Sequence, residues 1–479
     1  MSKIKSLFPE ANKITKIIEQ ISKAADTTGT ETYLVGGVIR DRLLGRETND
    51  IDITVVGSGI DFADKLAQFM KIEKVVKYEK FGTAMIPYGD YTIEVATARS
   101  EKYDDDSRKP EVEAGSLEED LKRRDFTINA LAMPLNSERI YELIDFYNGL
   151  QDLSNGVIKT PLEPEETFSE DPLRMLRAIR FATQLGFYIE NKTFQAISQV
   201  KERIKIISQE RITEEFVKMM KTRRKPSLGF KLLDKSGLLG IILPDIENLK
   251  GVDQKGQHHH KNVYHHTLQV LDNVAEVSDD FKLRFTALVH DIAKPQTKEF
   301  VAEKGWTFHG HELLGPEMIK RLCRELKLPN KVRDFAMKLT RLHLRPIALA
   351  KEGVTDSAVR RLLVEVEDDL DDLMTLCRAD ITTGNPQRLE QYLNNFQRVE
   401  EHIQKVKERD KLRKFQSPVD GDEIMDYFDL SPGPEVGYIK NSIEDAILDG
   451  EIPNEYESAY EYMENHAAEF RKKIREKFK

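Results

Sequence analysis

The chain has 479 residues, of which 39% are hydrophobic and 33% charged, and its formal net charge at pH 7 is -10. This length allows about three globular domains, and no apolar run approaches the length of a membrane span, which argues against an integral membrane protein. The negative charge argues against a protein uniformly coated with cations for nucleic acid. It does not exclude a local basic groove, because salt confines the field of a charge to about 10 Å.

Cysteine usage indicates the compartment. The chain has only two cysteines, Cys323 and Cys377, and they lie far apart in the sequence. Neither a disulfide framework nor a zinc finger can be built from this pair, so we expect a protein of the reducing cytosol.

The pattern of elements changes along the chain. Short β-rich segments bounded by glycine or polar turns predict strands at 32–37, 50–57, 81–89 and 91–97. Helical spacing of apolar residues predicts helices at 39–45 and 60–71. Beyond residue 160 the strand signals stop and helical patterns follow one another. The expected fold class is α+β, with a small α/β head that contains a mixed sheet, followed by an all-α remainder.

The first candidate site lies in the head. Asp50 and Asp52 alternate on one predicted strand, so their carboxylates point to the same face and need a cation between them. Gly36 and Gly37 form a turn before a helix, where backbone N–H groups can approach a phosphate. Glu94, on a later strand, is the natural third acid. Alone, each motif fits an ordinary turn or edge strand, but their spacing within one unit favours a metal-bound nucleotide site.

The segment 36–57, "GGVIRDRLLGRETNDIDITVVG", resembles the signature of class II tRNA nucleotidyltransferases and the related bacterial poly(A) polymerases. The resemblance implies that Asp50 and Asp52 hold Mg²⁺, which activates the RNA 3′-hydroxyl and steadies the nucleoside triphosphate. Gly36, Gly37 and Arg40 of the same signature are expected to bind the nucleotide.

A second motif, "RRDFTINALAM" at 123–133, places two arginines before an apolar, helix-like run. Such arginines commonly form surface salt bridges, yet arginine also suits bidentate contacts with phosphate. The segment resembles the family's ribose and triphosphate motif, which implies that Arg124, Asp125 and Asn129 contact the nucleotide.

A third motif runs from Glu170 through "EDPLRMLRAIRFATQLGF". Asp171 and Arg174 are three residues apart, and on spacing alone a weak surface ion pair is the favoured interpretation. The segment also resembles the family's protein template, in which an aspartate and an arginine select CTP or ATP and reject GTP and UTP. Arg177 completes the match.

Two further segments extend the resemblance. The polar stretch 98–110 is similar to the family's flexible loop, in which Asp104 and Arg108 would help the switch from C to A addition. The segment 208–220 looks like the neck helix, where Glu210 and Arg211 would support the template helix. The basic run at 221–225 fits a solvated helix end or a phosphate groove equally well, and RNA contact by the basic C-terminal tail also stays open.

The second half of the chain contains a separate set of histidines and aspartates in successive helical segments. These are His266, His290, Asp291, His311, His343 and Asp380. Mixed imidazole and carboxylate ligands suit Mn, Ni, Co, Fe or Zn ions. The set resembles the HD domain, whose H…HD…D core fits four of these residues, while His311 and His343 would permit a second metal and Lys294 fits the position that follows. In such fusions the HD domain resembles a phosphohydrolase of 2′- or 2′,3′-cyclic phosphate ends, but whether it is active here stays open.

Together these motifs predict a head at 1–150, a helical neck and body with the template at 151–250, an HD domain at 251–385 and a helical tail at 386–479. The expected function is CCA addition: C, C and A are joined to the tRNA 3′ end from CTP and ATP, with release of pyrophosphate. The alternatives are an A-adding enzyme or poly(A) polymerase, and, in another class, an HD phosphohydrolase whose head binds RNA. The sequence does not determine the oligomeric state.

Overall fold

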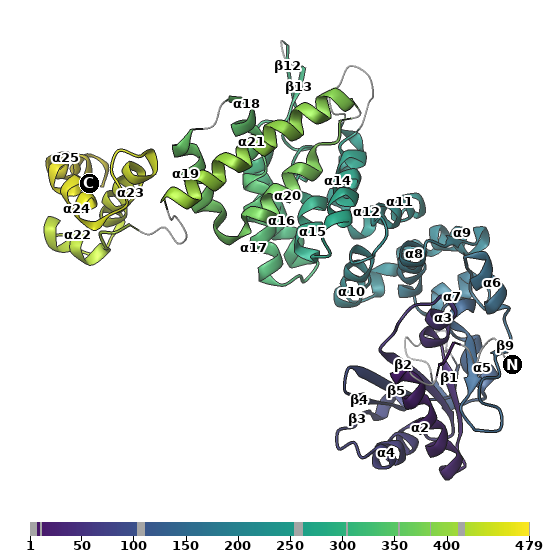
Figure 1. The fold of residues 1–479 in the computed structure, drawn as a ribbon. Helices are drawn as coiled ribbons and strands as arrows, with labels where there is room; N and C mark the ends of the chain where they lie inside the picture. Colours follow the sequence, from purple (N-terminus) through teal and green to yellow (C-terminus); the bar gives the residue numbers. More distant parts are fainter. Residues whose placement is uncertain are drawn as a thin grey trace. The chain divides into compact units, whose positions relative to one another are not determined.

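The computed structural model describes residues 7–9, 12–102, 111–252, 262–302, 305–352, 355–383, 385–410 and 417–478. The chain divides into two compact units, Met1–Leu243 and Pro244–Lys479, which are described separately (Figure 1). Among the described residues, no helix combines the length and apolar character that a membrane span requires.

The first unit is built on a mixed seven-stranded sheet with the order β3-β4-β5-β2-β1-β8-β9. The strands are β1 (Glu31–Val35), β2 (Asp50–Val56), β3 (Val76–Tyr78), β4 (Thr83–Tyr88), β5 (Tyr91–Thr97), β8 (Leu131–Pro134) and β9 (Ile144–Asp145). β2 and β5 pair in parallel, whereas the other neighbours are antiparallel. The expected strands and the helices at 39–45 and 60–71 are confirmed, as α3 (Gly37–Leu43) and α4 (Gly59–Met70).

Two helices, α2 (Lys13–Thr28) and α4, cover one face of this sheet (Figure 1). Ile51 and Ile53 of β2 belong to the core beneath these helices and are buried. Burial of an isoleucine side chain stabilises the fold by roughly 1.5–3 kcal/mol. Because strand side chains alternate, this burial turns Asp50 and Asp52 to the opposite face of the sheet.

The helix-like interpretation of 127–133 was wrong. A single 3-10 turn, Thr127–Asn129, leads into strand β8, which pairs with β1 and β9. All residues of β8 are buried. A strand buried on both faces lacks the polar alternation that distinguishes strands from helices in a sequence, which explains the error.

The remainder of the first unit is mostly helical. Its helices are α5 (Leu117–Lys122), α6 (Gly149–Asn155), α7 (Pro164–Glu170), α8 (Leu173–Leu185), α9 (Asn191–Val200), α10 (Gln209–Met220), α11 (Ser227–Ser236) and α12 (Leu239–Ile242). α8 begins directly after Pro172, ends before its C-cap Gly186, whose φ is 73°, and packs against α10 and α11. Two small sheets were not expected: β6 (Arg99–Lys102) with β7 (Glu111–Ala114), and β10 (Val157–Ile158) with β11 (Tyr188–Ile189).

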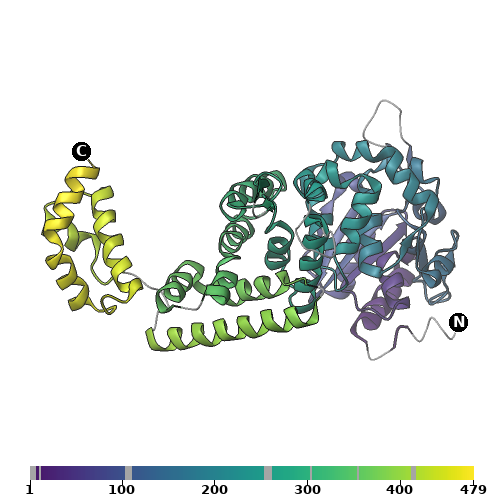
Figure 2. The same ribbon diagram turned by 90° about the horizontal axis from the view of Figure 1, so that it is seen from above.

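The second unit is also mostly helical. Its helices are α13 (Pro244–Glu247), α14 (Val263–Val277), α15 (Phe281–Val289), α16 (His311–Glu325), α17 (Asn330–Leu342), α18 (Arg345–Glu352), α19 (Asp356–Val366), α20 (Leu370–Asp380) and α21 (Pro386–Asp410). The long α21 packs along α18 and α19, as the yellow-green helix of Figure 2 shows. The unit also contains one antiparallel strand pair, β12 (Glu299–Val301) with β13 (Gly305–Thr307), outside the all-α expectation.

The C-terminal helices of the second unit have a hydrophobic core of their own. They are α22 (Gly421–Phe428), α23 (Pro434–Asp449), α24 (Tyr456–Asn465) and α25 (Ala467–Lys477). Arg361 on α19 pairs with Asp445 and Asp449 on α23, at 2.9 and 3.0 Å. With a mixed sheet in the head and helices through most of the remainder, the α+β fold class is confirmed.

Candidate functional site

Three carboxylates meet on one face of the head sheet. Asp52 and Glu94 are direct partners in the parallel pairing of β2 with β5, and Asp50 lies two residues before Asp52 on the same face. Burial raises the pKa of the Asp52 carboxyl to about 6; Arg124 opposes the rise, and the neighbouring carboxylates of Glu94 and Asp50 add to it. A group of acids that disfavour one another's ionisation is suited to binding a cation.

Because Gly36 has no side chain, the guanidinium of Arg124 can lie close to these acids. Its φ is +71°, in the region that favours glycine, and an added Cβ would lie 2.8 Å from a guanidinium nitrogen of Arg124 and 3.6 Å from Oδ2 of Asp52. Gly36 therefore serves two needs, the turn before α3 and space for the Arg124 side chain beside Asp52.

A buried acid, Asp120, holds the side chain of Arg124 in place. The Arg124 guanidinium lies 3.2 Å from Oδ2 of Asp120 and donates to Oγ1 of Thr54 at 3.4 Å, while Arg123 contacts the other Asp120 oxygen at 2.7 Å. Burial acts to raise the pKa of Asp120, yet the two arginines hold it below its usual value. Sequence reasoning missed Asp120, although its position on α5, three and four residues before the two arginines that follow this helix, was a usable signal.

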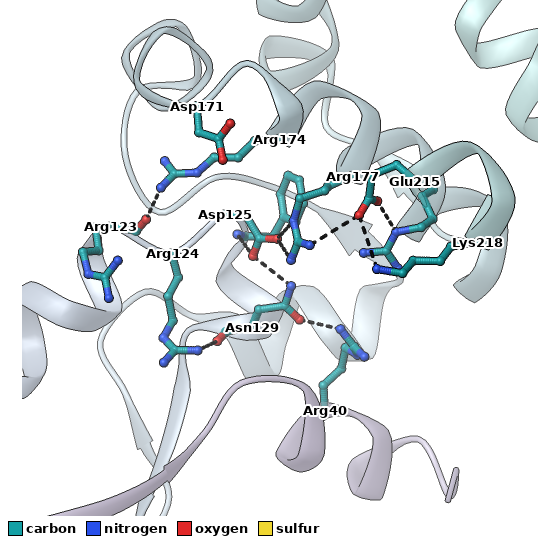
Figure 3. A network of polar contacts seen from close by, with 12 residues as sticks. Arg40, Arg123, Arg124, Asp125, Asn129, Asp171, Arg174, Arg177, Glu215 and Lys218 are labelled. Atoms are coloured by element: carbon teal, nitrogen blue, oxygen red, sulfur yellow. Dashed lines mark hydrogen bonds and ion pairs between the residues drawn. The ribbon is translucent and has the colours of Figure 1, made fainter. Parts of the chain in front are cut away.

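A hydrogen-bonded network joins the second motif to the third (Figure 3). Arg177 donates from Nε to Asp125 at 2.8 Å, and Nδ2 of Asn129 donates to the other Asp125 oxygen at 2.9 Å. Arg40 donates to Oδ1 of Asn129 at 2.6 Å. Burial opposes ionisation of Asp125, but Arg177 and Asn129 lower its pKa to about 2. The network therefore contains a permanently charged carboxylate at neutral pH.

Two residues that sequence reasoning missed support this network. Glu215, buried on α10, accepts a hydrogen bond from Arg180 and lies 3.7 Å from a guanidinium nitrogen of Arg177. The guanidinium groups of three arginines lie over the ring of Phe181. Their carbons are 3.9 Å (Arg180), 4.8 Å (Arg40) and 5.4 Å (Arg177) from the ring centroid. The available signal for Glu215 was its place on the apolar face of α10, three residues after Ile212 and four before Met219.

Asp171 and Arg174 have different partners. Arg211 donates to Oδ2 of Asp171 at 3.0 Å. Arg174 donates to Glu170 at 3.1 Å and to the backbone carbonyl of Arg123 at 2.6 Å. The two side chains lie in the same part of the network, above Arg123 in the view of Figure 3. Each is fixed from a different side, so both can address a ligand without first breaking a mutual ion pair.

Asp104 and Arg108 lie outside the described residues. Their suggested part in the switch from C to A addition stays a prediction.

In the second unit, the six predicted metal ligands converge in two groups. One group is His266, His290 and Asp380, and the other is Asp291, His311 and His343; within each group the ligand atoms lie within 4.8 Å of one another. Asp291 stands between the groups. Its Oδ2 lies 3.5 Å from Nε2 of His266 and 3.3 Å from Nε2 of His290, while its Oδ1 lies 3.4 Å from Nε2 of His311. Asp380 lies 2.8 Å from Nε2 of His266. Asp291, a member of the group with His311 and His343, thus also contacts both histidines of the other group and would be able to offer an oxygen to a metal held by either group.

The histidines are oriented as metal ligands. The Nδ1 atoms of His290, His311 and His343 each contact the carbonyl three residues earlier, at 2.9, 2.8 and 2.5 Å. Nδ1 of His266 contacts Oγ1 of Thr382 at 2.9 Å. A backbone carbonyl only accepts, so Nδ1 of His290, His311 and His343 donates, and in the neutral ring Nε2 is left with the electron pair that a metal can bind. Nε2 of His290 is buried, and its contacts with Asp291 at 3.3 Å and Asp380 at 3.6 Å lack hydrogen-bond geometry, which suits an atom that binds a metal.

The electrostatics of this cluster also favour a cation. Burial works to lower the pKa of His290, but Asp291 and Asp380 raise it to about 10. Burial, with His290 adding to the effect, lowers the pKa of His343 to about 4. Lys294 contacts Oδ2 of Asp291 at 2.6 Å, at the rim of the cluster. The donor set fits divalent ions, and its chemistry does not distinguish among the transition metals.

Three family models match consecutive parts of the chain. The Poly A polymerase head domain matches residues 32–159, the "Probable RNA and SrmB- binding site of polymerase A" matches 186–250, and the HD domain matches 263–384. The matches follow the order of the carboxylate site, the helical neck and the histidine cluster.

Curated relatives and solved structures agree with these models. The Multifunctional CCA protein of Psychromonas ingrahamii is 34% identical over 375 residues, which are 76% of this chain and 83% of that protein. The CCA-adding enzyme of Lactobacillus helveticus is 41% identical over 221 residues, 46% of this chain and about half, 51%, of that enzyme. A tRNA nucleotidyltransferase solved with a primer tRNA and an incoming ATP analog has 27% identity and a TM-score of 0.58, over 80% of this chain and 98% of that one. The chain therefore belongs to the family of CCA-adding nucleotidyltransferases, in the form that carries an HD domain.

Proposed function

We propose that the protein adds C, C and A to the tRNA 3′ end, using CTP and ATP and releasing pyrophosphate in the cytoplasm. The observation that carries the proposal is the register of β2 and β5, which sets Asp50, Asp52 and Glu94 on one face beside Arg124. Relatives named CCA-adding enzyme or Multifunctional CCA protein, and a solved relative with primer tRNA, support the same reaction.

The three carboxylates fit Mg²⁺, because their oxygens are hard ligands and because Asp52 is partly buried next to like charge. Bound there, Mg²⁺ would neutralise developing charge on the phosphates and lower the pKa of the RNA 3′-hydroxyl. Asp50 and Asp52 are the proposed principal ligands, with Glu94 as the third acid.

The side chains around the acids would position the nucleotide. Arg124, fixed by Asp120, offers a guanidinium to the triphosphate on the side of Asp52. The network of Arg40, Asp125 and Asn129 offers a rigid polar surface to the ribose. With the nucleotide so held, the 3′-oxygen forms a bond to the α-phosphorus while the bond from that phosphorus to the bridging oxygen breaks, and pyrophosphate leaves.

Base selection is proposed for Asp171 and Arg174. A carboxylate accepts and a guanidinium donates, so together they can address the Watson–Crick edge of cytosine or adenine. Arg211 holds the carboxylate of Asp171, and Glu170 holds the guanidinium of Arg174. Prior fixation lowers the entropy lost when the base binds, which favours discrimination between bases.

The test is an extension assay with tRNA transcripts that end before the CCA, after the first C and after CC. Each is incubated with Mg²⁺ and with CTP, ATP or both. Growth of the first transcript by C, C and A, followed by arrest, supports the proposal. Growth of the CC transcript alone, with ATP alone, would show an A-adding enzyme, and an unlimited A tail would show a poly(A) polymerase.

A second activity is favoured by the histidine cluster. We propose that the HD domain is a phosphohydrolase that removes a 2′-phosphate or opens a 2′,3′-cyclic phosphate, using Mn, Ni, Co, Fe or Zn ions. The convergence of His Nε2 atoms around Asp291 carries this proposal. RNA ends that carry a 2′,3′-cyclic phosphate and ends that carry a 2′-phosphate are incubated with the protein loaded with each of these metals, and at least one kind of end should be hydrolysed. If both kinds of end stay unchanged with every metal, the proposal is contradicted.

A further inference from the structure

The strand pair β12–β13 carries two exposed aromatic side chains. Phe300 and Trp306 are cross-strand partners, with 62% and 44% of their surfaces exposed and ring centroids 5.2 Å apart. The strand pair β12–β13 projects from the helices of its unit in Figure 1. Exposed aromatics on a two-stranded pair contribute little to a core and are a liability for aggregation, so a binding role accounts for them better than stability does.

A cation accompanies the aromatic pair. Nζ of Lys298 lies 4.6 Å from the centroid of the Trp306 ring. A lysine beside exposed aromatic faces favours a polyanion with flat rings, which describes an unpaired strand of RNA, over an apolar protein surface.

Both strands lead directly to the histidine cluster. Lys298 is four residues beyond Lys294, which contacts Asp291 at 2.6 Å. Trp306 is five residues before His311, whose Nε2 lies 3.4 Å from Asp291. Chain length alone limits the Cα separations to about 14 Å and about 18 Å, respectively. The aromatic pair therefore stands within a few nucleotides' reach of the cluster.

We propose that Phe300, Trp306 and Lys298 form a stacking platform that binds an unpaired base of the RNA end presented to the HD cluster. This proposal rests on the second activity proposed above and names its substrate class, a single-stranded RNA end. The rings would stack on a base of any identity, and Lys298 would contact the neighbouring phosphate.

The platform can be tested through Trp306 itself, because the chain contains one tryptophan. The holoenzyme is titrated with hexaadenylate RNA and with an abasic hexamer of equal charge, while tryptophan emission is recorded. We expect hexaadenylate to quench the emission and the abasic hexamer to leave it unchanged. No quenching, or equal quenching by both, would overturn the proposal.

Variants separate stacking from a folding effect. Anisotropy of labelled hexaadenylate should show about tenfold or greater loss of affinity for Trp306→Ala. Trp306→Tyr, which keeps an aromatic face, should stay within about threefold of wild type. Phe146→Ala removes another exposed, T-shaped aromatic pair and serves as the matched control. Equal loss in the Ala and Tyr variants would overturn the proposal, because it would point to the strand pair rather than the ring.

CCA addition and cyclic-phosphate opening are measured on the same samples. Intact activities without base-dependent quenching would reject the platform alone. Quenching without cyclic-phosphate opening would reject the second activity and keep the platform as an RNA-binding site.

Discussion

Asp52 and Glu94 stand side by side on neighbouring parallel strands, with the register Asp52↔Glu94. The chain between them contains α4, β3 and β4, so no sequence spacing defines this pairing. Its consequence is that partial burial raises the pKa of the Asp52 carboxyl to about 6, with the like charges of Glu94 and Asp50 adding to the effect.

Glu94→Gln should lower the rate of nucleotide addition by about a hundredfold or more, because the third acidic oxygen of the metal site is lost. Single-turnover addition of CMP to a transcript lacking CCA measures the effect. Asp90→Asn, which alters an exposed acid in the turn between β4 and β5, is the matched control and should behave as wild type. A Glu94→Gln enzyme with a near-normal rate would remove Glu94 from the site.

Arg211→Ala should reduce the preference for CTP and ATP over GTP and UTP by about fivefold, the factor that corresponds to about 1 kcal/mol. The reason is that Oδ2 of Asp171 loses its 3.0 Å partner, so the carboxylate is held less firmly, by the 3.1 Å hydrogen bond that Oδ1 accepts from the backbone N–H of Leu173. Competition between nucleotides in the extension assay measures the preference. Arg203→Ala removes an exposed arginine that bonds the carbonyl of Ser169, and should leave selectivity unchanged. If Arg211→Ala keeps the same nucleotide selectivity as Arg203→Ala, the positioning role of Arg211 is contradicted.

Asp125 should make the first unit sensitive to acid. Its pKa is about 2 in the folded protein, below the ordinary value of 3.8, so its stabilisation is complete above pH 3.8 and is lost as the pH falls toward 2. The loss between pH 5 and pH 3 should be about 1 kcal/mol.

Urea unfolding at these two pH values tests this for wild type and Asp125→Asn. The variant should be less stable at pH 5 and should lose less stability on acidification. Asp64→Asn, which removes an exposed acid paired with Lys77, should keep the wild-type pH dependence. An unchanged pH dependence in Asp125→Asn would show that Arg177 does not depress the pKa of Asp125 as described.

Asp291→Ala should abolish metal binding by the second unit, because this carboxylate faces both ligand groups. Metal content after loading with Mn²⁺ and desalting measures it. CCA addition should continue, since its proposed residues belong to the other unit. His402→Ala, which removes a histidine paired with Asp356, should retain metal. Loss of CCA addition in Asp291→Ala with an intact fold would mean that the HD cluster also supports the head.

The strands of the head could be predicted where one face is apolar and the other polar, as in Asp50–Val56. The same rule failed for Leu131–Pro134, because burial on both faces removes the alternation. Glu215 could not be predicted for a different reason. A buried acid is costly alone, and only the folded arrangement supplies its partner, Arg180 of α8. Asp120 has local partners in Arg123 and Arg124, so its role could have been predicted from their spacing.

The sequence by itself determined the local motifs: the glycine turn, the alternating acids, the paired arginines and the spaced histidines. These depend on residues near one another in the chain, where backbone geometry dictates which side chains share a face. The tertiary structure alone decided which distant groups meet. It set Glu94 beside Asp52, Arg211 on Asp171, and Asp291 between two groups of histidines. Such contacts follow from strand register and helix packing, which local sequence spacing does not define.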